Sequence, residues 1–391
     1  MTTTELPDDF YSALPVAAGR TAAMDYLRRP GPVYKVGATW LITSYDGVRY
    51  AQKNPELFSS AKAFDGLSDV IPMIPLAIDP PNHADYRRVL DPMFGPKRMD
   101  AMDADLRAQL RGHIDAFAPL GRCDVVADLS YKFPTQAILT LFGLPLEHLP
   151  QFLVWVTGII KGADITQLGL EPTPQVVECS MALFGFLQEQ IDAKRRHPGE
   201  DMLSSILALD GDQAWTDAEI LGLCFLIVLA GLDTVTGSIG FSLLTLANDV
   251  ALRHRLLADP DLIPPFVEEM LRLEGPVPGV PRRTTTDVEV EGVTIPANSP
   301  VLLMVSTANR EIPSAGPTPD ELDLTAKAAH LGFGGGIHRC LGSHLARREL
   351  RLTIEEFHAR IPDYRLAGDA TVLWPGGTFA LESLPLEFDP C

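Results

Sequence analysis

Residues 330–348, HLGFGGGIHRCLGSHLARR, decide how the rest of the chain is interpreted. A glycine-rich run, residues 333–336, leads to Cys340, and a helical pattern follows. Glycine occurs where a backbone approaches a neighbour closely or takes a positive φ, and amides in such a loop can point at a sulfur. The start of a helix beyond Cys340 adds positive partial charge, which favours a thiolate over a thiol. The stretch predicts a cysteine held as an anion beneath a flat or bulky object.

The spacing of six positions narrows this interpretation. The pattern F-G-x-G-x-H-x-C-x-G resembles the haem-ligand signature of the cytochrome P450 family. The resemblance implies haem b (iron protoporphyrin IX) as the cofactor, with Cys340 as the axial ligand of its iron. It also implies that the residues against the haem at this loop are Phe333, His338, Cys340 and Gly342.

Two other interpretations of Cys340 stay open at this point. A cysteine beside a turn can be a buried structural residue. Cys340 and His344 are also four positions apart, with His330 and His338 close by, as in some metal sites. Zinc sites usually need more cysteines at C-x-x-C spacing, and the sequence has none.

Composition bounds the class of protein. The chain has 391 residues, 46% of them hydrophobic, which is ample for a large core. A net charge of −19 favours solubility and argues against general nucleic-acid binding. Five scattered cysteines argue for a reducing cytoplasm. The opening MTTTELPDDFYSALP lacks signal-peptide features, and the longest apolar run, 221–232, is too short for a membrane span. We predict a cytoplasmic protein without a membrane anchor.

Helical periodicity dominates the pattern, for example over 102–117, 129–142 and 174–196. Short strands are predicted around Gly37 and again after residue 275. The expected fold class is mainly α with small β-sheets (α+β). The resemblance implies a triangular helical fold around a buried haem, formed as a single domain over 1–391. Its β-rich regions are expected near 33–78 and 276–296.

The longest predicted helix runs over 217–248 and opens with a capping box, T-x-x-E. Its glycines suggest that something approaches the backbone near Gly231. The Thr234 hydroxyl can bond back to the Ala230 carbonyl. Asp233 is unusual in so apolar a helix. The alternative to a functional role is a structural one, a salt bridge to a neighbouring helix. The stretch A-G-L-D-T resembles the distal-helix motif of cytochrome P450s, in which Asp233 and Thr234 deliver protons and Ala230 lies against the haem.

Three further matches follow from the same resemblance. In D-P-P-N-H-A-D-Y-R, His83 and Arg87 share one helical face and would contact the haem propionates. The spacing R-x-x-T-x-D selects Arg282 for the same task. Glu269 and Arg272, in E-x-x-R, match the structural ion pair of the family.

A substrate pocket is expected to be apolar. Residues 59–78 are irregular and apolar, so they cover either the core or the pocket. The predicted lining residues are Phe64, Ile71, Leu226, Leu229, Ala230, Val280 and Phe379. The resemblance implies a monooxygenase that inserts one oxygen atom from O2 into a C–H bond, here of a terpenoid, steroid or fatty-acid-like molecule.

Electrons must come from another protein, because no dinucleotide, flavin or iron–sulfur motif is present. Basic residues gather in 87–98 and 339–351. They predict docking of an acidic partner such as a ferredoxin near Arg88, Arg339 and Arg348, unless these arginines pair internally. We expect a monomer. Alternative functions are a peroxide-driven haem enzyme, a haem-based sensor or carrier, and a helical binding protein with a structural Cys340.

Overall fold

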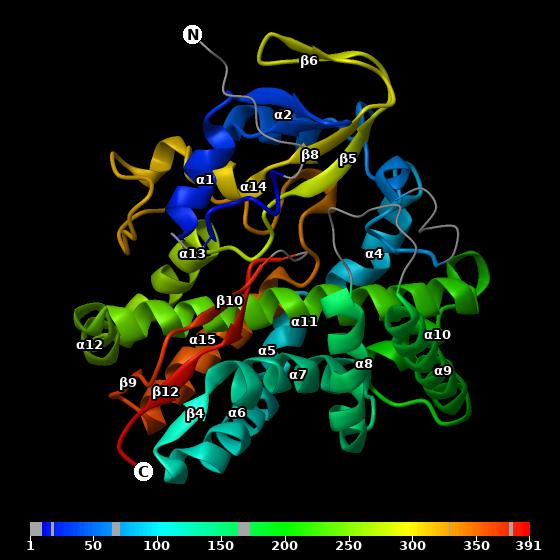
Figure 1. Ribbon diagram of the computed structural model, residues 1–391. Helices are drawn as coiled ribbons and strands as arrows, with labels where there is room; N and C mark the ends of the chain where they lie inside the picture. Colours follow the sequence, from blue (N-terminus) through cyan, green and yellow to red (C-terminus); the bar gives the residue numbers. More distant parts are fainter. Residues whose placement is uncertain (1–9, 17–18, 65–70, 163–172, 328, 375–377) are drawn as a thin grey trace.

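A computed structural model describes residues 10–16, 19–64, 71–162, 173–327, 329–374 and 378–391. Helices make up most of it, and one long helix, α11 (Asp217–Asn248), crosses the middle of the molecule (Figure 1). The others are α1 (Arg20–Arg28), α2 (Tyr45–Lys53), α4 (His83–Met93), α5 (Pro96–Ala101), α6 (Asp103–Phe117), α7 (Lys132–Phe142), α8 (Leu149–Gly162), α9 (Pro174–Arg196), α10 (Met202–Leu207), α12 (Val250–Ala258), α13 (Ile263–Leu273), α14 (Val305–Ala308) and α15 (Ser343–Arg360).

In the described part of the chain, four small sheets accompany the helices. The largest has the strand order β1-β2-β8-β5-β3, in which β2 and β8 are parallel and the other neighbours antiparallel. It lies on the far side of α11 from α6 and α7 (Figure 1). Its strands are β1 (Val33–Val36), β2 (Thr39–Ile42), β3 (Phe58–Ser59), β5 (Val280–Thr284) and β8 (Pro300–Leu303). The smaller sheets contain β4 (Arg122–Asp124), β6 (Val288–Val290), β7 (Val293–Ile295), β9 (Arg365–Leu366), β10 (Thr371–Leu373), β11 (Ala380–Ser383) and β12 (Pro385–Glu387).

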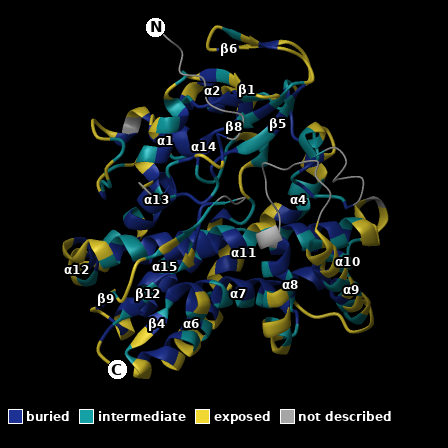
Figure 2. Ribbon diagram, viewed as in Figure 1, coloured by how far each residue is buried: buried dark blue, intermediate teal, exposed yellow. Residues whose placement is uncertain are grey.

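Helix α11 begins where the sequence predicts. The Thr216 side chain accepts a hydrogen bond from the Glu219 amide at 3.3 Å, and the Glu219 carboxylate accepts one from the Thr216 amide at 2.7 Å. Most of the helix is buried (Figure 2). It is long and apolar enough to cross a membrane by length and composition alone, with 61% of its most apolar window buried. Since α7, α15 and β11 pack against it, α11 is a core helix.

The glycines of α11 admit close neighbours at several points along the helix. A Cβ on Gly222 would lie 2.0 Å from the Pro72 carbonyl oxygen, and one on Gly237 would lie 2.6 Å from that of Phe379. Beside Gly231 the neighbour is only the end of the Ile138 side chain, at 3.0 Å. Gly231 is thus approached closely, as predicted, but by a side chain and beside the cavity, and the approaches of backbone lie about two turns on either side.

Several of the predicted helix and turn boundaries agree closely with the structure. Helices α9 and α11 have the predicted bounds, and Gly37 forms the β1–β2 turn with φ 55°. Helix α7 starts later than predicted, at Lys132, because a π-helical turn over Val126–Ser130 precedes it. Helix α8 falls in a part of the chain that the sequence predicts to be helical, although no bounds are predicted for it. Residues 65–70 of the covering segment predicted over 59–78 lie outside the described residues.

Candidate active site

A cavity of about 430 Å³ lies between α11 and the loop that carries Cys340. Its walls come from α11, residues 332–342, residues 276–282 and the start of α15. Most of the lining side chains are apolar, which suits a flat hydrophobic group or ligand. Helices α4 and α2 each add one polar side chain, Arg87 and Gln52.

The Cys340 loop needs its glycines for packing as well as for turning. Gly334 and Gly336 have φ of 66° and 64°, which side chains rarely adopt. A Cβ on Gly336 would lie 1.9 Å from the carbonyl oxygen of Gln52, so the end of α2 rests directly on the loop. The Cys340 amide closes the turn by donating to the Phe333 carbonyl at 2.8 Å. Sequence reasoning missed Gln52, which no motif marks.

The Cys340 side chain is accessible because it faces the cavity. Burial among protein atoms raises the pKa of the thiol, and this outweighs the Gly342 amide bonded to the sulfur and the charges of Arg87 and Arg339. The protein alone therefore does not favour the thiolate, contrary to the expectation from the helix start. A cation bound in the cavity would supply the missing charge, as a coordinated metal does.

Basic side chains gather at one end of the cavity. The rings of His83 and His338 lie 4.5 Å apart, and the Nε2 atom of each is buried without a hydrogen-bond partner among the described residues. Burial, followed by the charges of Arg282 and His83, lowers the pKa of His338 to about 3. Burial also lowers the pKa of Arg282 to about 10.

The side chains of His83, His338 and Arg282 keep hydrogen-bonding capacity that the described residues do not use. The Arg282 guanidinium donates to the Pro281 carbonyl at 2.6 Å and forms no ion pair within the described part of the chain. Arg87 differs, because it pairs with Asp91 at 2.7 Å and donates to the Arg339 carbonyl at 2.8 Å. Orphaned buried donors beside an apolar cavity fit an apolar ring system that carries carboxylates, as haem does. Arg87, Arg282 and His338 line the cavity, whereas His83 lies behind His338.

The zinc interpretation finds no geometric support in the described part of the chain. There, no three His, Cys, Asp or Glu side chains come together as a metal site would require. Cys340 also precedes α15, so Cys340 and His344 do not share a helical face. A single thiol facing an apolar cavity would suit a haem better than a zinc ion, which needs several ligands.

Across the cavity, α11 presents Ala230, Gly231 and Thr234. The Thr234 hydroxyl donates to the Ala230 carbonyl at 2.8 Å, as predicted, although α11 stays continuous there. Asp233 does not line the cavity and instead accepts a hydrogen bond from the Thr378 hydroxyl. Burial raises the pKa of Asp233, against the opposing effect of Thr378. None of the ion pairs in the described residues includes Asp233, so the salt-bridge alternative lacks support.

The predicted substrate lining is partly right. Phe64, Leu226, Ala230 and Val280 line the cavity, while Ile71, Leu229 and Phe379 do not. Phe379 is fully buried, because its ring stacks on Trp374 at 4.6 Å and lies 3.7 Å from the Arg20 guanidinium. Leu229 packs on the main core, and Ile71 is buried outside the cavity. Lining residues that the sequence did not indicate include Pro75, Leu76, Ile138, Ile227, Val277 and Val305.

The Glu269–Arg272 pair lies outside the cavity and is wholly buried. Arg272 donates to the Glu269 carboxylate at 2.8 and 2.7 Å. The guanidinium also donates to carbonyls of Asn309, Pro319 and Glu321. Glu269 accepts from the Asp323 amide at 3.1 Å. The pair therefore joins α13 to the loops that lead toward Cys340.

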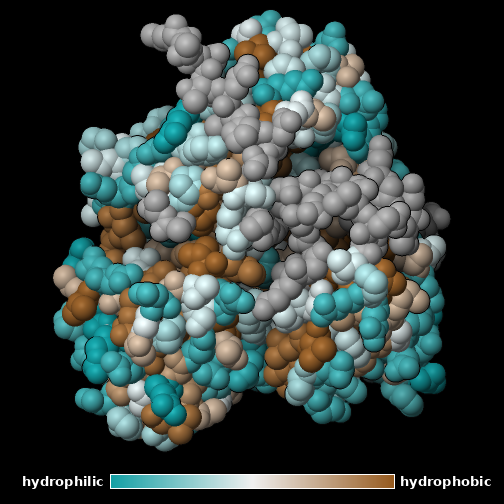
Figure 3. Space-filling view, viewed as in Figure 1, coloured by the Kyte–Doolittle hydropathy of each residue, from teal (hydrophilic) through white to brown (hydrophobic). Residues whose placement is uncertain are grey.

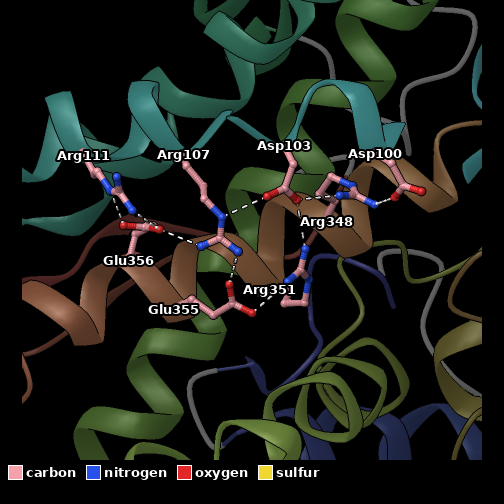
Figure 4. Close-up of polar contacts among 8 residues, drawn as sticks. All are labelled: Asp100, Asp103, Arg107, Arg111, Arg348, Arg351, Glu355 and Glu356. Atoms are coloured by element: carbon pink, nitrogen blue, oxygen red, sulfur yellow. Dashed lines mark hydrogen bonds and ion pairs between the residues drawn. The ribbon is translucent and has the colours of Figure 1, made fainter. Parts of the chain in front are cut away.

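Many of the arginines predicted to form a basic patch are already paired. Arg348 contacts Asp100 and Asp103, and Arg351 contacts Asp103 and Glu355, in a network that ties α5 and α6 to α15 (Figure 4). Arg347 pairs with Glu268 at 2.6 Å. Arg88 pairs with Asp85 at 3.0 Å, both well exposed, and the described residues give Arg339 no ion pair.

A cavity with one thiol below, a threonine-bearing helix above and orphaned basic groups at its edge defines the site of a haem-thiolate protein. A family model for cytochrome P450 matches residues 254–357. Cytochrome P450 130 of Mycobacterium tuberculosis is 33% identical over 363 residues, which cover 89% of this chain and 88% of the relative. The vitamin D(3) 25-hydroxylase of Pseudonocardia autotrophica is also 33% identical, covering 87% and 86%.

Solved structures agree with these relatives. P450BioI bound to an acyl carrier protein that carries hexadec-9Z-enoic acid superposes with a TM-score of 0.87 at 28% identity, covering 96% of this chain and 100% of that one. A Bacillus megaterium cytochrome P450 in complex with testosterone gives 0.84 at 26% identity, covering 98% and 100%. The chain belongs to the cytochrome P450 family. It is a haem b-dependent monooxygenase, and the predicted fold class and cofactor are confirmed.

Proposed function

We propose that this monooxygenase hydroxylates a lipophilic small molecule of the steroid, terpenoid or fatty-acid class. The observation that carries the proposal is the apolar lining of the cavity above Cys340, with Phe64, Leu226 and Val280 on its walls. Relatives are named as a vitamin D(3) 25-hydroxylase and a steroid C26-monooxygenase, and a structural neighbour holds testosterone. Such ligands would gain about 25 cal/mol for each Å² of apolar surface that they bury.

We assign the side chains around the cavity to three tasks. Cys340 would ligate the haem iron, while His83, Arg87, Arg282 and His338 would hold the propionates. Phe333, Gly342 and Ala230 would pack against the ring. Thr234 and Asp233 would hand protons to the distal side. When bound, the haem supplies the activation of dioxygen, and a thiolate ligand favours O–O cleavage.

For electron supply we propose an acidic ferredoxin that docks on the face of α4 and the Cys340 loop. Arg339 supports this because it is exposed next to Cys340 and the described residues offer it no ion pair. Arg88 is exposed and its bond to Asp85 is a surface pair, which costs little to exchange. Arg348 is a weaker candidate for docking, because it already forms ion pairs with Asp100 and Asp103.

We further propose that residues 1–391 form one domain that acts as a monomer in the cytoplasm. The net charge of −19 suits a soluble protein, and Figure 3 shows hydrophilic residues over much of one face. Sedimentation at micromolar concentration tests the oligomeric state, and a stable dimer would contradict it.

The first experiment is the absorption spectrum of the reduced protein with carbon monoxide, for the wild type and Cys340→Ala. A strongly red-shifted Soret band that the variant loses would support Cys340 as the ligand, and a histidine-like band in both would contradict it. Titration with testosterone and with hexadec-9-enoic acid, followed by the spin-state shift, then tests the substrate class. Binding of neither lipophilic probe, with binding of charged metabolites, would reject it.

Docking is tested by charge reversal at Arg88. Arg88→Glu should slow reduction by an acidic ferredoxin several-fold at low salt without changing probe binding. Reversal at Arg348 would also break its internal ion pairs, so it is the less informative variant. Unchanged reduction in both Arg88→Glu and Arg339→Glu would reject the docking surface.

A further inference from the structure

The carboxyl group of Asp233 has an unusual environment for a buried acid. It is 8% exposed, and the Thr378 hydroxyl donates to its Oδ2 atom. The Oδ1 atom is buried with no hydrogen-bond partner among the described residues. Burying a carboxyl group costs free energy when it has one hydrogen-bond partner and no cation beside it. The Thr378 hydroxyl therefore has a large effect on the orientation of the Asp233 carboxyl.

The position of Thr378 is fixed by the backbone next to it. The Phe379 amide donates to the Pro276 carbonyl at 2.7 Å. The Phe379 carbonyl oxygen lies so close to α11 that a Cβ on Gly237 would come within 2.6 Å of it. Gly237 follows Asp233 by one helical turn, and β11 continues along α11. The hydroxyl is therefore presented to Asp233 by a segment pressed onto the same helix.

Asp233 and Thr234 face different directions because consecutive residues on a helix are about 100° apart. Thr234 lines the cavity, and Asp233 faces Thr378. A proton that travels from Asp233 to the cavity must leave an oxygen whose orientation Thr378 sets. Burial raises the pKa of Asp233, which makes the protonated acid more accessible than for a surface aspartate.

Resting on the proposed role of Asp233, we propose that Thr378 is a positioning residue for proton delivery. The overall reaction consumes one C–H substrate, one O2, two protons and two electrons, and yields the alcohol and one water. The ferredoxin supplies the electrons, and solvent replaces the proton that Asp233 releases. Thr378 neither gains nor loses a proton in the balance, since its hydroxyl only holds the Asp233 oxygen.

The test compares two ways of driving the holoenzyme, with testosterone or hexadec-9-enoic acid as the probe substrate. With O2, a plant-type ferredoxin and its reductase, turnover needs protons from the relay. With hydrogen peroxide, the oxidant brings both protons and both electrons, and turnover needs no relay. Thr378→Val should lower O2-driven product formation about tenfold, raise peroxide release per electron consumed, and enlarge the solvent deuterium isotope effect. Its peroxide-driven rate should match the wild type.

Two further variants sharpen the result. Thr378→Ser keeps a hydroxyl and should restore O2-driven coupling. Ser383→Ala is the matched control, since Ser383 stands in the same hairpin and donates to Asp124 at 2.6 Å, and it should leave coupling unchanged. Should Thr378→Val fail to retain haem, Thr378→Ala is compared with Thr378→Ser in the same way.

Several outcomes would overturn the inference. Equal losses in the O2-driven and peroxide-driven rates of Thr378→Val would mean a merely structural role. Normal coupling in Thr378→Val together with poor coupling in Asp233→Asn would reject Thr378 and keep Asp233 as the relay acid. Normal coupling in Asp233→Asn would reject the proposed role of Asp233 itself, and the inference with it.

Discussion

A methyl group on Gly222 of α11 would lie 2.0 Å from the carbonyl oxygen of Pro72. Alanine is preferred over glycine inside a helix by up to about 1 kcal/mol, so sequence rules alone favour Gly222→Ala. The contact is with backbone, which must move to make room. We expect Gly222→Ala to destabilise the fold by about 1–3 kcal/mol, measured by urea unfolding.

The matched control for this variant is Gly185→Ala in α9, where no atom of the described residues lies within 4 Å of the added carbon. This change should stabilise the protein slightly, by less than about 1 kcal/mol. If both variants gained stability alike, the Pro72 segment would have to be freely displaceable, and the close packing onto α11 would be refuted.

Breaking the Glu269–Arg272 pair should be costly. Both side chains are buried, so Glu269→Gln leaves a guanidinium without its counter-charge, at a cost of about 3–5 kcal/mol. Asp85→Asn breaks the exposed pair with Arg88 and should cost less than about 1 kcal/mol. Urea midpoints of the two variants make the comparison, and similar small losses would contradict the burial of the first pair.

Removing the Arg282 charge should weaken the hold on haem. Arg282→Gln should speed haem transfer to an apomyoglobin acceptor by about 10–100-fold, because hydrogen bonds to charged groups are worth about 1.5–3 kcal/mol. The neighbouring Arg283 is a matched control, since it donates to carbonyls of Lys62 and Asn298 and does not line the cavity. Arg283→Gln should retain haem, and equal loss from both would argue against a propionate contact.

The carboxylate of Glu268 should make stability depend on pH. Burial acts to raise its pKa, yet hydrogen bonds from Arg347 and His330 outweigh burial and lower the pKa of Glu268 to about 2. Because the folded value lies below the unfolded one of about 4.5, this stabilisation is complete above about pH 4.5. It is then lost as the pH falls toward about 2.

Glu268→Gln should therefore be less stable than the wild type at pH 7, and the difference should shrink below about pH 4.5. Thermal unfolding at several pH values measures it. Glu189→Gln, on an exposed part of α9, is the reference. A Glu268→Gln deficit that stayed constant down to pH 3 would show that the ion pairs with Arg347 and His330 contribute nothing.

Sequence reasoning succeeds where the chemistry is local. Three features depend on residues that are close together in the sequence, and the structure contains each of them. They are the loop around Cys340, the Thr216–Glu219 cap and the hydrogen bond from Thr234 to the preceding turn. Position on a helix likewise places Glu269 beside Arg272.

Sequence reasoning fails where distant segments meet. Gln52 and Thr378 reach the site through tertiary packing, from segments that carry no motif. Phe379 is among the predicted lining residues, yet Arg20 and Trp374 enclose it. The charge of Arg348 could be counted from the sequence, whereas its pairing with Asp100 depends on how α5 meets α15.

The parallel pairing of β2 with β8 joins residues 39–42 to residues 300–303. A ribosome adds about 5–20 residues per second, so the N-terminal hairpin waits on the order of tens of seconds for its partner strand. During that time β2 has an unpaired edge that can bind the wrong chain. Added chaperone should therefore raise the soluble yield, because the nascent chain must be shielded until its last quarter emerges.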